Sequence, residues 1–164
     1  MAKTPKDLND LFYETLKDIY YAEKQILKAL PKMSKAAQSQ ELSAAFLKHR
    51  DETKIHVERL VEVFEIIGKP ARAKVCDAIV GILAEGDEIT EDFAGTDALD
   101  PGLLAAAQAV EHYEISRYGT LKAWASQLGM KDAVELLDQT LGEEKHTDEA
   151  LTLLATGSVN LKAA

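Results

Sequence analysis

Acidic and imidazole side chains interrupt the apolar faces of four long stretches of this sequence. Glu23 lies between Leu16 and Ile26 at steps of three and four residues, which place such side chains on one face of a helix. An unpaired carboxylate in a protein core costs several kcal/mol, whereas a small domain has a net stability of about 5–15 kcal/mol. Several core acids therefore need positive charge beside them, and a pair of metal ions is the simplest source.

The candidate metal ligands come from all four stretches. Each central acid lies roughly 12–15 residues from the start of its helix, which is near mid-height at about 1.5 Å per residue. Helical bundles bind dinuclear centres with a Glu from each of two helices and a Glu-x-x-His from each of the other two. The predicted ligands are Glu23, Glu52, Glu114, Glu144, His49, His56, Glu111 and Asp148.

Two histidines accompany the acid of the second stretch. His49 precedes Glu52 by three residues and His56 follows it by four, so the three side chains share a helix face. Imidazole is a suitable ligand for iron, zinc or manganese. A hydrogen-bonded role in the core is the alternative for each histidine.

The register of the fourth stretch leaves two ligand pairs open. Glu144 and Asp148 follow the apolar face, whereas Glu143 and His146 have the Glu-x-x-His spacing. Both pairs cannot point fully inward. The apolar pattern favours Glu144 with Asp148.

Helix start and stop signals divide the chain into four long helices and a connecting segment. Thr4-Pro5 favours a helix start and Pro31 an end or a kink, while Ser39 is a cap for the next helix. Asp100-Pro101-Gly102 is a further start, and Gly157 an end before a loose tail. We predict helices over residues 5–31, 40–67, 101–128 and 132–155, and a crossover over 69–100 with one short helix or two interrupted near Gly86.

The lengths of the connections predict how the helices are arranged. Two short turns make antiparallel pairs, and the long middle segment carries the chain back along the bundle. We therefore predict an all-α fold, a ferritin-like antiparallel four-helix bundle with a long helical crossover between the second and third helices. The whole chain, 1–164, is expected to form this one domain.

Composition narrows the classes of function. A net charge of −9 argues against nucleic-acid binding through phosphates. No apolar run is long enough to cross a membrane, and residues 1–7 contain no apolar core of a secretion signal. Cys76 is the only cysteine, which excludes an internal disulfide. We expect a cytoplasmic protein.

Four motifs resemble those of the YciE/YciF-type ferritin-like proteins of bacteria, which are linked to stress responses. The resemblance covers nearly the whole chain and implies a ferritin-like fold, a homodimer and a dinuclear metal centre, but no particular reaction. The matching strings are A-E-K-Q at residues 22–25, H-R-D-E-T at 49–53, E-H-Y-E-I at 111–115 with Y-G-T-L at 118–121, and E-E-K-x-x-D at 143–148.

Three functions remain open. The first is a protein with two divalent metal ions, iron or else manganese or zinc, that oxidises Fe(II) or reduces a small-molecule oxidant such as peroxide or dioxygen. The second is a non-enzymatic scaffold or dimer with a structural metal. The third is a metal-free buried network that the acids form with Arg59, waters and shared protons. No catalytic residue is assigned.

Overall fold

The computed structural model describes residues 4–164, and every element in this part of the chain is helical. Residues 1–3, which belong to the predicted domain and to the segment searched for a secretion signal, lie outside the described residues. The elements are α1 (Leu8–Ala36), α2 (Gln40–Ile66), α3 (Asp77–Asp92), α4 (Leu99–Gln127), α5 (Lys131–Leu154), a π-helical turn η1 (Ala155–Val159) and α6 (Asn160–Ala163).

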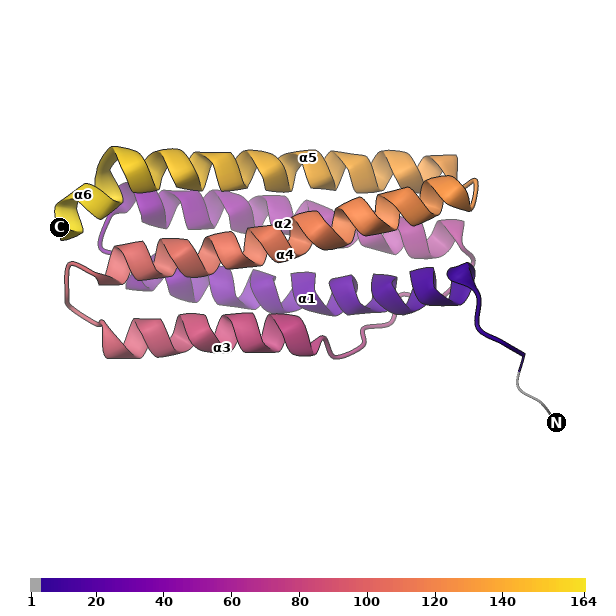
Figure 1. The fold of residues 1–164 in the computed structure, drawn as a ribbon, viewed down its shortest axis with the longest axis horizontal. Helices are drawn as coiled ribbons and strands as arrows, with labels where there is room; N and C mark the ends of the chain where they lie inside the picture. The colour runs from indigo at the N-terminus through magenta and orange to yellow at the C-terminus, as the bar shows by residue number, and fades with distance from the viewer. Residues whose placement is uncertain (1–3) are drawn as a thin grey trace.

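Four of these helices form the bundle. Helix α1 packs on α2 and α4, and α5 packs on the same two helices, so the four make a square in which every neighbouring pair is antiparallel (Figure 1). Helix α3 runs outside the square beside α1 and α4 and carries the chain back along the bundle. This confirms the predicted all-α bundle with a crossover between its second and third helices.

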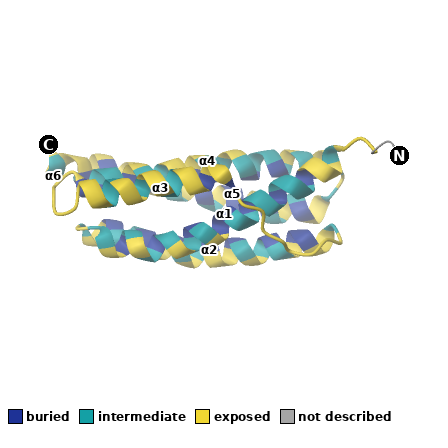
Figure 2. Ribbon diagram, turned by 90° about the horizontal axis from the view of Figure 1, so that it is seen from below, coloured by how far each residue is buried: buried dark blue, intermediate teal, exposed yellow. Residues whose placement is uncertain are grey.

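The core follows the apolar periodicity of the long helices. Buried residues recur at steps of three and four along each of them and face the bundle axis, while exposed residues face outward (Figure 2). On α1 the step pattern places Glu23 between Ile19 and Ile26, all of them at most 1% exposed. The periodicity that buries the apolar side chains of α1 therefore also buries Glu23 in the core.

Both ends of α1 differ from the prediction. The helix begins at Leu8 because Asp7 and Asp10 form a capping box, which satisfies two backbone N–H groups. Pro31 does not end it. The last turn is secured by Ser43 on α2, whose hydroxyl lies 2.8 Å from that of Ser34 and donates to its carbonyl at 2.9 Å. These contacts offset the one backbone hydrogen bond that proline removes.

The C-terminal end of α5 also differs. Gly157 does not stop the chain's helical path, because η1 follows α5 directly and leads into α6. Ala155 and Val159 are 7% and 4% exposed, so this turn buries apolar side chains against the bundle. The tail that we expected to be loose is therefore packed over its first turn.

The crossover contains one helix, which continues through Gly86 without interruption. At its far end Gly102 allows α3 and α4 to approach closely, since a Cβ there would lie 2.5 Å from Cγ2 of Ile89. Asp100 is buried in the first turn of α4, and its two carboxylate oxygens accept hydrogen bonds from the backbone N–H groups of Gln38 and Ser39 at 2.8 and 2.7 Å. Asp100 thus joins the crossover to the α1–α2 turn.

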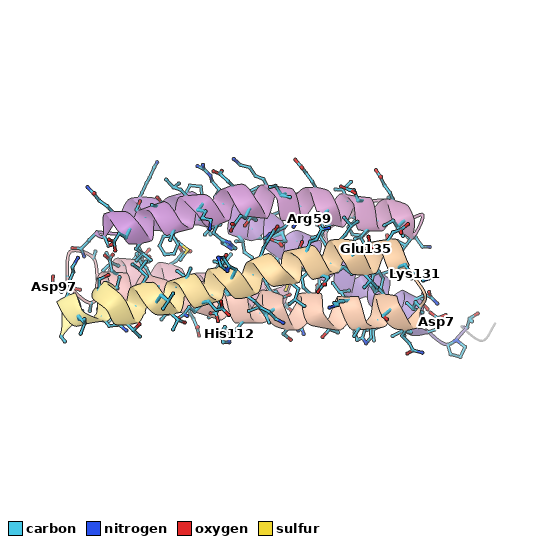
Figure 3. The ribbon with its side chains drawn as sticks, turned by 90° about the horizontal axis from the view of Figure 1, so that it is seen from above. Asp7, Arg59, Asp97, His112, Lys131 and Glu135 are labelled. Carbon is cyan, nitrogen blue, oxygen red and sulfur yellow. The ribbon has the colours of Figure 1, made fainter. Side chains whose placement is uncertain are left out.

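Replacing Asp100 with Ala should destabilise the fold by about 2–3 kcal/mol, because two part-buried backbone N–H groups lose charge-assisted hydrogen bonds. Urea denaturation measures this loss. Asp97→Ala, which removes an exposed acid in the loop just before α4 (Figure 3), is the control and should change the free energy of unfolding by less than about 0.5 kcal/mol. Equal effects of the two substitutions would contradict the assignment.

None of the helices in the described part of the chain is both long enough and apolar enough to cross a membrane.

Candidate metal centre

Two groups of buried acids and histidines meet at mid-height in the bundle. Within each group, one potential ligand atom per residue lies within 4.8 Å of the others. The first group draws on α2, α4 and α5, and the second on α1, α2 and α5. Their members are His49, Glu111, Glu114 and Glu144, and Glu23, His56 and Glu144.

Glu144 on α5 belongs to both groups. Its Oε2 atom lies 3.9 Å from Nε2 of His49, and its Oε1 atom lies 2.9 Å from Nδ1 of His56. A carboxylate that presents one oxygen to each group can bridge two cations. The geometry therefore favours two adjacent ion positions rather than one.

The clearest indication that these residues fit a cation site is a set of buried polar atoms without hydrogen-bond partners. More than about 90% of buried polar atoms in proteins have a hydrogen-bond partner. Here nine buried side-chain nitrogen and oxygen atoms without one lie on the six residues of the two groups. Those residues carry four carboxylates and two imidazoles, so two divalent cations would balance the charge with both histidines neutral. The donor set fits iron, manganese or zinc.

Without metal, protons would have to neutralise the cluster. Burial raises the pKa values of Glu111 and Glu114 well above their ordinary range. Burial alone would lower the pKa of His56, but the carboxylate oxygens of Glu144 and Glu23 beside Nδ1 outweigh it and raise the pKa to about 10. The pKa of His49 is raised in the same way, against burial, by Glu111 and Glu52. The cluster thus retains protons in a pH range where metal would compete for the same sites.

His56 is oriented from outside the cluster. Its Nε2 atom donates to Glu143 at 2.8 Å, which leaves Nδ1 facing Glu144 and Glu23. Arg59 in turn donates two hydrogen bonds to Glu143, at 2.7 and 2.9 Å, and lies between α2 and α5 (Figure 3). The hydrogen bond from Arg59 lowers the pKa of Glu143. An ionised acid that holds the far nitrogen of a histidine is a common outer support for a metal ligand.

His49 has a looser outer partner. Its Nε2 atom lies 3.0 Å from Glu111, and its Nδ1 atom lies 3.9 Å from Glu52. The Glu52 side chain is 26% exposed and also lies 3.7 Å from the ammonium group of Lys48. Glu52 therefore stands at the solvent edge, outside both groups. Three residues after His49 are about 60° short of a full turn, so Glu52 lies at the margin of the shared face rather than at the bundle axis.

Asp148 is the other predicted ligand that the structure does not bring to the centre. Its carboxylate accepts hydrogen bonds from Gln108 and His112, each at 3.2 Å, on the outer side of the α4–α5 pair. His146 is exposed, so the alternative pair of Glu143 and His146 does not face inward either. Among the acids and histidines of α5, only Glu144 is buried toward the axis.

Tyr118 supports the acid of α1. Its hydroxyl donates to Glu23, and both side chains are fully buried. Burial raises the pKa of Tyr118 well above its ordinary value, so the phenol keeps its proton. This fixes one oxygen of Glu23 and leaves the other free for a cation.

The outer partners were the part of the site that the ligand pattern did not reveal. The sequence pattern presents Glu143 only as a ligand and Arg59 only as a partner for buried acids. A signal did exist, because Arg59 follows His56 by three residues and therefore lies beside it on α2.

A helical bundle with one long crossover and a buried cluster of carboxylates and histidines has the architecture of the ferritin-like carboxylate proteins. Comparison with known proteins gives the particular family. Residues 7–164 match the family DUF892, described as a domain of unknown function, and the chain belongs to it. It is 45% identical to Protein YciF of Escherichia coli K12 over 160 residues, 96% of each chain.

Two solved structures have the same fold and similar sequences. The E. coli stress protein YciF matches with a TM-score of 0.91 and 43% identity, covering 95% of this chain and 99% of that one. YcfI from Rhodopseudomonas palustris matches with a TM-score of 0.88 and 44% identity, covering 93% and 97%.

Proposed function

We propose that this chain is a dinuclear metal protein of the YciF-type stress family, with iron as the resident metal and manganese or zinc as alternatives. The nine unpaired polar atoms at one level of the core carry the proposal. His49, Glu111 and Glu114 would hold one ion, Glu23 and His56 the other, and Glu144 would contact both. Such a metal pair supplies one-electron chemistry, here the oxidation of Fe(II) with reduction of dioxygen or peroxide.

The chain's own residues would bind the ions, hold the metal ligands in position and keep water out of the site. Glu143 and Tyr118 hold His56 and Glu23 in place. In the metal-free chain the raised pKa values of Glu111 and Glu114 let these two ligands retain protons, which the ions would displace on binding. Each of the six residues around the ions is at most 3% exposed, so bulk water is largely kept out. We extend the proposal, on the family resemblance, to a cytoplasmic homodimer.

Anaerobic titration with Fe(II) tests the metal centre. We expect two iron ions per chain, because the two groups share only Glu144. Air-oxidised protein should then show the charge-transfer absorbance of ferric carboxylates. Binding of less than one ion per chain, with no gain from manganese or zinc, would overturn the proposal.

A structural role for the ions is the second candidate, since the R. palustris relative is described as a candidate structural protein. The rate of Fe(II) oxidation distinguishes a redox centre from a structural metal site. A protein that binds two ions but oxidises Fe(II) no faster than buffer would be a scaffold with a structural metal.

A further inference from the structure

Two cavities lie between α1, α3 and α4, on the side of the bundle that the crossover covers. The outer one has a volume of about 330 Å³, and polar groups such as Lys32 and Glu91 stand at its lining beside Ile82 and Ala106. The inner one, about 10 Å³, touches Ile26 and Ala107 and ends on His49 and Glu111. Figure 1 shows α3 lying alongside this side of the bundle.

The two cavities share a wall. Ala29, Met33, Leu83 and Val110 line both of them. These four side chains are apolar and come from all three helices. A molecule that passes between them moves from the outer cavity to the imidazole of His49 without crossing a polar barrier.

Size and polarity determine what can use this path. A space of about 10–15 Å³ holds one water-sized molecule, and a water there needs two to four polar partners. The inner cavity offers only His49 and Glu111 among apolar side chains. Water, ions and peroxide would lose hydrogen bonds on entry, whereas an uncharged apolar diatomic molecule would not.

The opposite side of the bundle has a different opening. A surface hollow between α2 and α5 is lined by Glu52, Arg59, Asp138, Glu143 and His146. It leads to the outer partners of both histidines and suits cations. The apolar cavities are therefore not the only approach to the centre, and their lack of charge distinguishes them.

We propose that the apolar cavities beneath α3 form a passage for dioxygen, which enters between α1, α3 and α4 and reaches the centre beside His49 and Glu111. The proposal deepens the proposed function, since it names dioxygen as the oxidant. The binding of dioxygen to the cavities does not itself require a metal.

Paramagnetic relaxation by dissolved dioxygen tests the passage in the metal-free and zinc-loaded full chain. Methyl NMR signals of Ile26, Ala107 and Val110, which line the cavities, should broaden at least severalfold more than those of Leu60 and Leu137. All five side chains are at most 5% exposed, so bulk dioxygen affects them equally. Equal broadening of the two sets would overturn the passage, whether or not the chain binds iron.

A substitution that fills the shared wall tests the route to iron. Ala29→Phe should slow oxidation of bound Fe(II) by dioxygen about tenfold, the effect of roughly 1.4 kcal/mol in a barrier. Oxidation by peroxide and the affinity for Fe(II) should stay unchanged. Ala36→Phe is the control, since Ala36 is also half-buried on α1 but lines neither cavity.

Each outcome of this comparison decides one point. An unchanged rate with dioxygen in Ala29→Phe overturns the route, and so does an equal loss in Ala36→Phe. If iron does not bind at all, the proposed function fails, while the relaxation measurement still tests the cavities. The same measurement holds if Ala29→Phe does not fold, because it uses the natural sequence.

Discussion

Replacing Glu144 with Gln is expected to weaken the binding of both metal ions by more than about 100-fold, or more than about 2.7 kcal/mol. Glu144 presents one oxygen to His49 and the other to His56, so it is the one acid shared by both groups. Gln retains the volume and removes the charge. Anaerobic Fe(II) titration, or Co(II) titration followed by absorbance, measures both affinities.

Glu143→Gln is the matched comparison, because the two acids are adjacent on α5 but differ by about 100° around the helix. Glu143 contacts His56 only through Nε2, so its loss should weaken one ion by about 10–100-fold and leave the other unchanged. Glu135→Gln, an exposed acid on the same helix (Figure 3), should change neither. Loss of both ions in Glu143→Gln with retention in Glu144→Gln would show that the register of α5 in the site is wrong.

The inward acids could be predicted because helix periodicity decides them. Glu23, Glu114 and Glu144 each fall within a series of buried positions at steps of three and four, and burial of the apolar members of that series carries the acid inward. Asp148 follows Glu144 by four residues, but its side chain does not share the inward direction of Glu144. Four residues are about 40° more than one full turn, and Gln108 and His112 of α4 bind the displaced carboxylate.

Features that depend on contacts between distant segments could not be predicted in the same way. Past Pro31, the last turn of α1 is held by hydrogen bonds between Ser34 and Ser43 of the next helix. The role of Asp100 depends on two N–H groups more than 60 residues away along the chain. Local propensity predicts a helix end at Pro31 and a helix start at Asp100. The structural roles of both residues also involve hydrogen bonds between segments that are distant in the sequence.

The metal-free protein is expected to lose stability as the pH rises from 6 to 8. The folded-state pKa values of Glu111 and Glu114 are raised by burial, and those of His49 and His56 by their acidic partners. The folded chain therefore binds more protons than the unfolded chain in this range, and the free energy of unfolding falls with pH. For His56 the contribution is complete below its unfolded pKa of 6.5 and is lost as the pH passes about 10.

The acids with lowered pKa values do not cancel this slope. Glu52, Glu143 and Glu144 contribute stability above their ordinary value of 4.5, and that stability is lost only as the pH falls below it. They are ionised in both states between pH 6 and 8. Each extra proton held by the folded state contributes about 1.4 kcal/mol per pH unit. One such proton gives a fall in Tm of roughly 5–10 °C over the two units.

Metal should reverse the trend, because ions displace these protons and bind more tightly as the pH rises. At free metal 100 times the Kd, one site adds about 2.7 kcal/mol, so the Tm difference between loaded and metal-free protein should widen from pH 6 to 8. Thermal melts with metal and with a chelator measure it. Glu114→Gln, which cannot lose a proton, should flatten the metal-free slope, whereas Glu65→Gln, exposed near the end of α2, should leave it unchanged. A Tm that is independent of both pH and metal would contradict a proton-loaded cluster and a bound centre together.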